Sequence, residues 1–368
     1  MRIGISCRSL EYPSGGVKEY LLSLVRALLA LDSRNTYVLF HAAKRHFGLF
    51  SGVEDISLEC PNRLAFDWLA LPGALKKHRI DVAFFPSSNM PPRVPCKAVV
   101  TMHDLGYFEK TYSMYRLADT LYMKWAMAYT ARRAERLVAI SRYTKEDIMR
   151  VLGVPQERVS VIHEAADPMY HDPVPGDAVQ AFRLRHGLSR PFFLYTGSIS
   201  PRKNLKTLLR AFHAVHERVD ADLVVTGGLS WNEDWDALLA PFDPRGRVLR
   251  LGDVPRRDMP ALYASALAFV FPSLFEGFGL PVLEAQAVGV PVICSNAASL
   301  PEVAGESAWM IDPQDVSGLA DALEKTASDA SLRENLTALG FANARRFSWE
   351  DTAAKTLEVF EDVHRANV

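Results

Sequence analysis

The sequence predicts an α/β protein made of two doubly wound domains. Short apolar runs alternate with amphipathic helical patterns along most of the chain, as a parallel sheet built from βαβ units requires. With 368 residues, the chain exceeds the ~250 to 300 residues at which a single core stops growing. Segment 172–177 (DPVPGD) marks a boundary, so we expect domains at 1–172 and 173–348, with a last helix at 349–368 returning to the first domain.

The bulk composition describes a soluble globular enzyme and excludes some partners. Hydrophobic residues make up 49% of the chain and the net charge is −1, so there is no basic field to attract nucleic acid. No C-x-x-C spacing joins Cys7, Cys60, Cys96 and Cys294, which favours free thiols in a reducing, cytoplasmic location. The first residues lack a signal peptide's apolar run and no stretch reaches the length of a membrane span, so any membrane contact is expected to be peripheral.

The N-terminal half opens as a strand, a glycine loop and a helix. Gly15 and Gly16 precede the helical pattern but do not form G-x-G-x-x-G, so a nicotinamide-binding fingerprint is absent, and a Gly-Gly pair alone is usually a plain turn. The strands expected here are 3–6, 37–40, 81–85, 97–102 and 136–140, and the helices are 17–31, 64–78 and 115–136.

His103 and Asp104 stand directly after the strand expected at 97–102. A lone histidine is usually a satisfied structural residue, but ligands of parallel sheets gather where strands end, and that position favours function. Helix 115–136 mixes aromatic, Met and basic residues, so it is either ordinary core or a face that meets a lipid-linked acceptor or a membrane surface.

The C-terminal half repeats the alternation. Its expected strands are 191–196, 221–226, 248–252 and 266–271, and its expected helices include one starting at Pro281 and others at 314–327 and 331–347. Arg202 and Lys203 lie at the start of the helix that follows the first of these strands. Unpaired N–H groups there favour anions, so two cations can clamp a diphosphate; the alternative is ordinary basic surface.

The organising stretch of the chain is FPSLFEGFGLPVLEAQAVGVP, which joins a buried strand to a helix. Gly277 and Gly279 allow the loop to turn, and Pro281 suits the first turn of a helix, whose free amides form an anion site. Glu276 and Glu284 can accept sugar or ribose hydroxyls. The alternative is that Glu284 complements the helix dipole from the first turn and Glu276 is a solvated loop residue.

Glu-Gly-Phe-Gly-Leu-Pro-x-x-Glu-Ala resembles the E-x7-E signature of the retaining glycosyltransferases of family four, and the likeness extends over nearly the whole chain. The resemblance implies the GT-B fold: two Rossmann-like domains facing a central cleft. It also implies that Glu276 contacts the transferred sugar, Glu284 the nucleotide ribose, and His103 the sugar near its 6-hydroxyl.

The same resemblance assigns the remaining candidates. Arg202 and Lys203 would stabilise the leaving diphosphate together with the backbone of Phe278, Gly279 and Leu280. Gly15, Gly16 and Gly197 would approach the donor through their backbones, and Asp253 and Val254 would border the nucleotide base.

The chain departs from the family pattern in two places. Ser198 follows Gly197 where many members have Arg, and Arg202 is the candidate substitute. Glu164, Ala165, Ala166 and Asp167 stand where the family often has Asn-Gly-Val-Asp, so no role of that Asn-Gly pair transfers.

The H-D-L and P-R-K-N elements resemble mannosyltransferases of surface polysaccharide and lipopolysaccharide assembly, which implies transfer of mannose from GDP-mannose to a glycan or lipid-linked acceptor. A UDP-hexose donor is the alternative. A sugar-nucleotide epimerase, a pyridoxal-dependent phosphorylase and a non-catalytic binding protein are further hypotheses. No metal or other cofactor is expected, because the family binds its diphosphate without a divalent ion and no D-x-D pair follows a strand. The inner face of the cytoplasmic membrane is the place expected for any membrane contact.

Overall fold

The computed structural model describes residues 1–12, 15–109, 116–228, 234–243 and 246–366. These residues form two compact units, one of residues 1–164 with 348–368 and the other of residues 165–347. The division therefore follows Glu164, eight residues before the boundary expected from 172–177. The observed boundary lies earlier because the chain leaves the first sheet just after its last strand, which ends at Val161. The proline-rich segment instead marks the loop that leads into α6 (Gly176–Arg185).

The first unit contains a seven-stranded sheet in which every pairing is parallel. In spatial order its strands are β3 (Glu54–Ser57), β2 (Thr36–His41), β1 (Arg2–Ser6), β4 (Val82–Phe85), β5 (Lys97–Met102), β6 (Arg136–Ala139) and β7 (Val159–Val161). The sequence did not predict β3, because its EDIS segment is an edge strand with no continuous apolar run.

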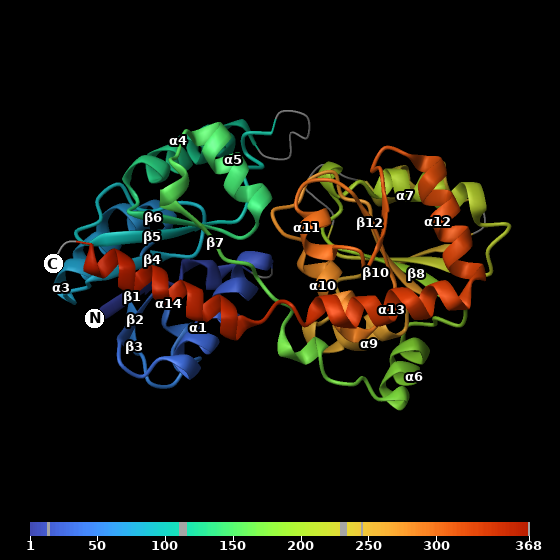
Figure 1. The fold of residues 1–368 in the computed structure, drawn as a ribbon, viewed down its shortest axis with the longest axis horizontal. Coiled ribbons are helices and arrows are strands. Elements are labelled where there is room, and N and C mark those ends of the chain that lie inside the picture. The colour runs from blue at the N-terminus through green and yellow to red at the C-terminus, as the bar shows by residue number, and fades with distance from the viewer. Residues whose placement is uncertain (13–14, 110–115, 229–233, 244–245, 367–368) are drawn as a thin grey trace. The chain divides into compact units, whose positions relative to one another are not determined.

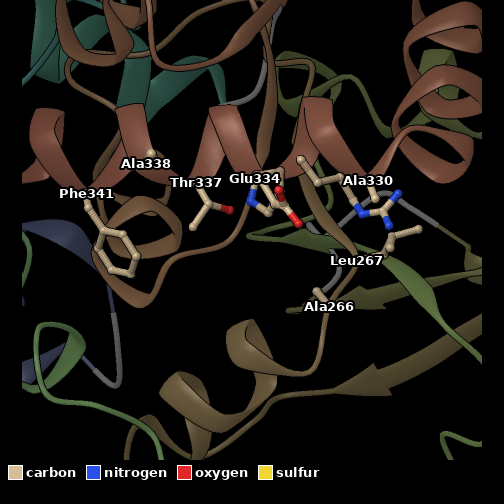
Figure 2. Close-up of a pocket in the computed structure, with 9 residues that line it drawn as sticks. Ala266, Leu267, Ala330, Glu334, Thr337, Ala338 and Phe341 are labelled. Atoms are coloured by element: carbon tan, nitrogen blue, oxygen red, sulfur yellow. The ribbon is translucent and has the colours of Figure 1, made fainter.

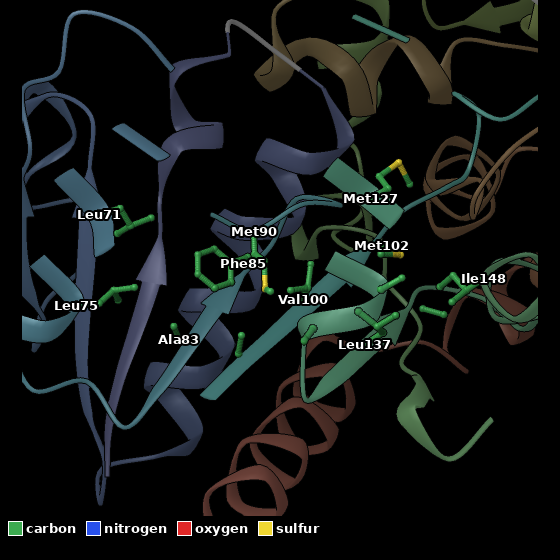
Figure 3. Packing of buried hydrophobic residues seen from close by; sticks show 14 of the residues in the cluster. Leu71, Leu75, Ala83, Phe85, Met90, Val100, Met102, Met127, Leu137 and Ile148 are labelled. Carbon is green, nitrogen blue, oxygen red and sulfur yellow. The ribbon is translucent and has the colours of Figure 1, made fainter. Parts of the chain in front are cut away.

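Helices cover both faces of this sheet (Figure 1). They are α1 (Gly16–Leu31), α2 (Arg63–Ala65), α3 (Leu71–Lys77), α4 (Leu117–Arg133), α5 (Arg142–Leu152) and α14 (Trp349–Arg365). Successive strand residues point to opposite faces, and β4 shows the result: Phe85 belongs to the core under α3, α4 and α5, whereas Phe84 packs against Phe360 of α14. Figure 3 shows the core that contains Phe85. The returning helix is thus part of the first unit, as expected; Tyr115, the expected start of α4, lies outside the described residues.

The second unit contains a six-stranded sheet, again with parallel pairings throughout. Its spatial order is β10 (Val248–Gly252), β9 (Asp222–Thr226), β8 (Phe192–Thr196), β11 (Ala268–Phe271), β12 (Val292–Ser295) and β13 (Trp309–Ile311). Its helices, besides α6, are α7 (Leu205–Val215), α8 (Trp235–Leu239), α9 (Met259–Ala264), α10 (Leu280–Val288), α11 (Leu300–Ala304), α12 (Val316–Ser328) and α13 (Ala330–Ala344). Two doubly wound parallel sheets confirm the predicted fold class.

The loops that leave β8, β9 and β10 approach one another through their backbones. Gly197 donates its N–H to Thr226 O at 3.1 Å, and Gly227 donates to Gly252 O at 2.9 Å. Gly227 has φ +119°, and a Cβ there would lie 2.2 Å from Gly197 O. Its neighbour Gly228 has an ordinary φ, and a Cβ there would first meet Asp253 Oδ1 at 3.8 Å.

Gly227→Ala is expected to lower the free energy of unfolding of the second unit by about 3 kcal/mol, because the new Cβ adds left-handed strain to a backbone clash. Gly228→Ala, the matched control, should cost less than about 1 kcal/mol. Urea unfolding curves compare the two variants, and equal midpoints would contradict the close approach.

Candidate active site

The candidate residues of the second unit follow the carboxyl ends of its strands, which we call the carboxyl edge of the sheet. Gly197 follows β8, Asp253 and Val254 follow β10, and Glu276 follows β11. Because parallel strands end at one edge, the fold brings together loops that are far apart in the sequence. Asp253 is exposed and Val254 is half-buried at this edge.

Glu276 is buried against two cations. Lys203 Nζ lies 2.6 Å from Glu276 Oε1, and Arg202 Nη1 lies 3.2 Å from Glu276 Oε2. Burial by itself would raise the pKa of Glu276, but the charges of Lys203 and Arg202 outweigh it and hold that pKa below its usual value. The solvated-loop alternative for Glu276 is therefore wrong, since only 6% of the residue is exposed.

Lys203 is itself buried, with 8% exposed, and its Nζ lies 4.5 Å from the centroid of the Phe271 ring. It belongs, with Arg202, to a one-turn 3-10 helix, Pro201–Lys203, that precedes α7. The two cations therefore lie one turn before the helix at whose start the sequence placed them. Together with Glu276 they leave a net charge of +1 at the carboxyl edge, which suits an anionic ligand.

The loop after Glu276 has its shape fixed by side chains around it. Ser299 Oγ lies 3.0 Å from Glu276 O and 2.6 Å from Phe278 O. The Phe278 ring is buried against Phe347 at 5.7 Å between centroids. Gly279 has φ +118°, a conformation that favours glycine, and α10 begins at the next residue, Leu280. The glycine loop thus leads directly into a helix N-terminus, as the sequence predicted.

Glu284 is the fifth residue of α10, so it lies in the second turn and not, as expected, in the first. The Tyr263 hydroxyl donates to Glu284 Oε2 at 2.9 Å. The Tyr170 hydroxyl also acts on this carboxylate and lowers its pKa. Burial raises the pKa of Glu284 to about 7, against the opposing effects of these hydroxyls and of the Arg256 charge. The dipole-complement alternative is wrong, because a first-turn surface carboxylate would not have these surroundings.

Sequence reasoning missed Tyr170, Tyr263 and Arg256. The Arg256 guanidinium pairs with Asp167 at 2.5 Å, and the rings of Tyr170 and Tyr263 lie 5.9 Å apart. The only available signal was position: Tyr170 follows Asp167 closely, and Arg256 follows the loop at Asp253 and Val254. No local pattern marks the two tyrosines as partners of Glu284.

In the first unit, His103 lies at the carboxyl edge, directly after β5. Its Nε2 lies 2.8 Å from Pro86 O and its Nδ1 lies 3.2 Å from Glu164 Oε1. Its ring also makes an edge contact with Tyr20 of α1, at 4.9 Å between centroids. Both ring nitrogens are therefore engaged by the protein, which the sequence did not predict.

Gly15 and Gly16 stand at the start of α1 on the same edge of the first sheet. Gly15 has φ +129° and caps the helix, and no atom of the described residues lies within 4 Å of a Cβ built on either residue. Both glycines are exposed. The open space around them fits a backbone that approaches a ligand.

A pocket of about 540 Å³ lies elsewhere in the second unit, beside α13 (Figure 2). Its lining includes Ala266 and Leu267, which precede β11, and Pro291, which precedes β12. These residues stand at the amino ends of the strands, opposite the carboxyl edge. None of the predicted site residues lines this pocket, so it is not the candidate active site.

Two family models match the chain. The model described as Glycosyltransferase Family 4 matches residues 14–170, and the model described as Glycosyl transferases group 1 matches residues 178–341. The first match covers most of the first unit and the first six residues of the second, and the other match lies within the second unit.

Individual known proteins resemble the chain too. O-antigen chain mannosyltransferase B of Escherichia coli is 30% identical over 98% of this chain and 100% of the relative. The serotype-specific mannosyltransferase WbdA of E. coli is 30% identical over 73% of this chain, which corresponds to 34% of that longer protein.

Among solved structures, Anabaena HepE in complex with UDP and glucose has a TM-score of 0.79 and 18% identity, covering 98% of this chain and 100% of the other. This likeness confirms the GT-B fold that the sequence resemblance implied. With a full-length relative at 30% identity and a family model on each unit, the chain belongs to the glycosyltransferases of family 4.

Proposed function

We propose that this protein is a retaining mannosyltransferase that transfers mannose from GDP-mannose to a growing O-antigen chain of lipopolysaccharide. The observation that carries the proposal is the buried cluster of Glu276, Lys203 and Arg202 at the carboxyl edge of the second sheet. Its net positive charge suits a nucleoside diphosphate, and its carboxylate suits sugar hydroxyls. The choice of mannose rests on the full-length E. coli relative, which is named for O-antigen mannose transfer.

In this proposal the diphosphate of the donor exchanges places with Glu276 at the cations. Lys203 and Arg202 are already paired with Glu276, so a diphosphate that binds them frees carboxylate oxygens for the hydroxyls of the transferred sugar. The loop backbone at Phe278, Gly279 and Leu280 supplies further N–H groups at the start of α10. These groups stabilise the negative charge that develops on the leaving diphosphate.

The nucleoside half of the donor is assigned to the groups around Glu284. The carboxylate accepts the ribose hydroxyls while the hydroxyls of Tyr263 and Tyr170 hold it in place. The base lies against the loop of Asp253 and Val254. Gly197 has no side chain, so its backbone can approach the donor closely. On the first unit, His103, Gly15 and Gly16 border the transferred sugar.

We propose that transfer needs no metal ion. Two cations and the helix N-terminus neutralise the leaving group, and within the described ranges no three His, Cys, Asp or Glu side chains form a group that could hold a metal. Mannose transfer should therefore persist in excess EDTA.

Incubating the purified protein with GDP-mannose, UDP-glucose or UDP-galactose and a polyprenyl-diphosphate-linked glycan acceptor tests the proposal. The expected product is an α-linked mannoside formed from GDP-mannose alone, at an unchanged rate in EDTA. Transfer from a UDP-hexose would support the alternative donor. Conversion of a nucleotide sugar without an acceptor, seen by NMR, would identify an epimerase.

Glu284→Gln is expected to weaken binding of free GDP and to remove its pH dependence. With a pKa of about 7, ionised Glu284 rises from about a tenth to about nine tenths of the protein between about pH 6 and about pH 8, so wild-type affinity should rise about tenfold. Glu276→Gln is the matched control: it should keep this pH dependence, because Glu276 contacts the sugar that GDP lacks, yet it should lower turnover. Calorimetry measures GDP affinity for both variants. The nucleotide phosphate titrates equally in both measurements, so its effect cancels when the two variants are compared. Equal GDP losses in two folded variants would contradict this division.

We further propose a peripheral contact of the first unit with an anionic membrane surface at the inner face of the cytoplasmic membrane. No helix in the described part of the chain is both long and apolar enough to span a bilayer. Instead, Leu69 and Leu121 are 75% and 60% exposed, and the exposed rings of Trp68 and Trp125 lie 5.9 Å apart. Helix α4, which carries Leu121 and Trp125, also carries the basic residues Lys124, Arg132 and Arg133, and Arg63 of α2 precedes Trp68 and Leu69 in the sequence.

The double variant Leu69→Gln/Leu121→Gln is expected to bind vesicles of phosphatidylethanolamine and phosphatidylglycerol about tenfold more weakly, because two apolar side chains leave the interface. Leu184→Gln, on α6 of the second unit, is the matched control: Leu184 is 83% exposed and its loss should leave vesicle binding unchanged. Co-sedimentation measures both. Identical binding by the double variant and wild type would remove this patch from the membrane contact.

A further inference from the structure

Neither hydrogen-bond partner of the His103 ring can donate while Glu164 is ionised. Pro86 O, 2.8 Å from Nε2, is a backbone carbonyl, and Glu164 Oε1, 3.2 Å from Nδ1, belongs to a carboxylate. A neutral imidazole carries one N–H and could satisfy one of them. Both contacts can be hydrogen bonds at the same time only if both ring nitrogens carry protons. The geometry therefore selects the imidazolium.

The surroundings favour the same charge state. Burial alone would lower the pKa of His103, but the hydrogen bond and charge of Glu164 outweigh it, and Pro86 O and the Asp104 charge act in the same direction, so the pKa is raised. Tyr20 of α1 presents its ring, while its hydroxyl lies 3.0 Å from the Thr101 hydroxyl. The charged groups that raise the pKa of His103 include two anions, Asp104 on its own loop and Glu164 on the segment after β7.

Glu164 is buried, and contacts of the neighbouring backbone with α14 fix its position. Its side chain is 4% exposed, and the backbone carbonyl of the preceding residue, His163, accepts a hydrogen bond from the Thr352 hydroxyl of α14 at 2.7 Å. Trp349 of the same helix packs against Tyr20, at 5.9 Å between centroids. The carboxylate is also the residue at which the sequence departs from the family's Asn-Gly pattern, and an Asn-Gly pair would supply no charge there.

We propose that Glu164 is a positioning residue that keeps His103 as an imidazolium, fixed by two donated hydrogen bonds and unable to act as a general base. The inference rests on the proposed function, in which His103 borders the transferred sugar. With no lone pair on either ring nitrogen, the acceptor proton must go elsewhere. The bond between the anomeric carbon and the donor phosphate breaks, the acceptor oxygen bonds to that carbon, and the released phosphate oxygen takes the proton.

The direction of the pH dependence separates the two roles of histidine. A general base gains activity as pH rises through its pKa, whereas a required imidazolium loses it. Turnover of the wild type should therefore fall on the alkaline side. Replacing the Glu164 charge lowers the pKa of His103, and the loss of one nearby opposite charge corresponds to about 1 to 3 pH units, so the falling limb moves to lower pH. At a pH above the alkaline decline of both proteins, kcat of the variant should be below that of the wild type. The difference should be about tenfold for every pH unit by which the decline has moved.

The experiment compares kcat and KM for the wild type, Glu164→Gln and Glu164→Asp across the pH range from about 6 to about 9. Glu164→Gln should move the alkaline limb down while changing KM for the donor less than about twofold. Glu164→Asp, which keeps the charge, should return the limb most of the way to its wild-type position. Glu54→Gln is the matched control, because it breaks another His–Glu pair of the same unit, with His78 Nδ1 at 2.9 Å, and should leave the limb in place.

Nitrogen NMR of the full-length wild type tests the charge state without any variant of Glu164 and without activity. The His103 signal, assigned by its loss in His103→Asn, should show two protonated nitrogens near neutral pH. A neutral tautomer, or a kcat that rises with pH through the His103 pKa, would overturn the proposal. A wild type that transfers no sugar from any donor would refute the proposed function, while the NMR result would still decide the ionisation of His103.

Discussion

A buried carboxylate must be compensated, and this constraint organises the candidate groups of both units. Moving an ionised carboxylate out of water costs several kcal/mol unless a partner of opposite charge and further hydrogen bonds replace the water. In the second unit, Lys203 and Arg202 compensate Glu276. In the first unit, His103 compensates Glu164. Each pair lies at the carboxyl edge of its sheet, where parallel strands end. The fold therefore buries these charges at the edge where ligands of parallel sheets usually bind.

The same residue type serves two purposes within one short stretch. Glu276 lies against two cations and its pKa is lowered, whereas Glu284 lies among tyrosine hydroxyls and its pKa is raised to about 7. The cations beside the first therefore favour its ionised form. The second changes charge near neutral pH, so its affinity for hydroxyl groups depends on protonation. The environment, and not the spacing of the two glutamates, makes the difference.

Residues next to one another in the sequence were the ones that sequence reasoning could place. Most strands of both sheets and the long helices beside them follow from apolar periodicity, and the glycine loop before α10 follows from Gly279 and Pro281. The edge strand β3 escaped prediction because it lacks an apolar run. The partners of the site residues escaped for another reason: Tyr263 reaches Glu284, and Glu164 reaches His103, across distances in sequence that no local pattern records.

The departure at Glu164 shows how a sequence pattern and a structure inform each other. From the sequence, replacement of an Asn-Gly pair only removed a role that the family suggested. In the structure, the same position supplies the acceptor that, with Pro86 O, engages both nitrogens of His103. A histidine that donates a hydrogen bond from each nitrogen offers its charge and its fixed ring but no base. In the function proposed above, the acceptor proton would then pass to the phosphate of the donor.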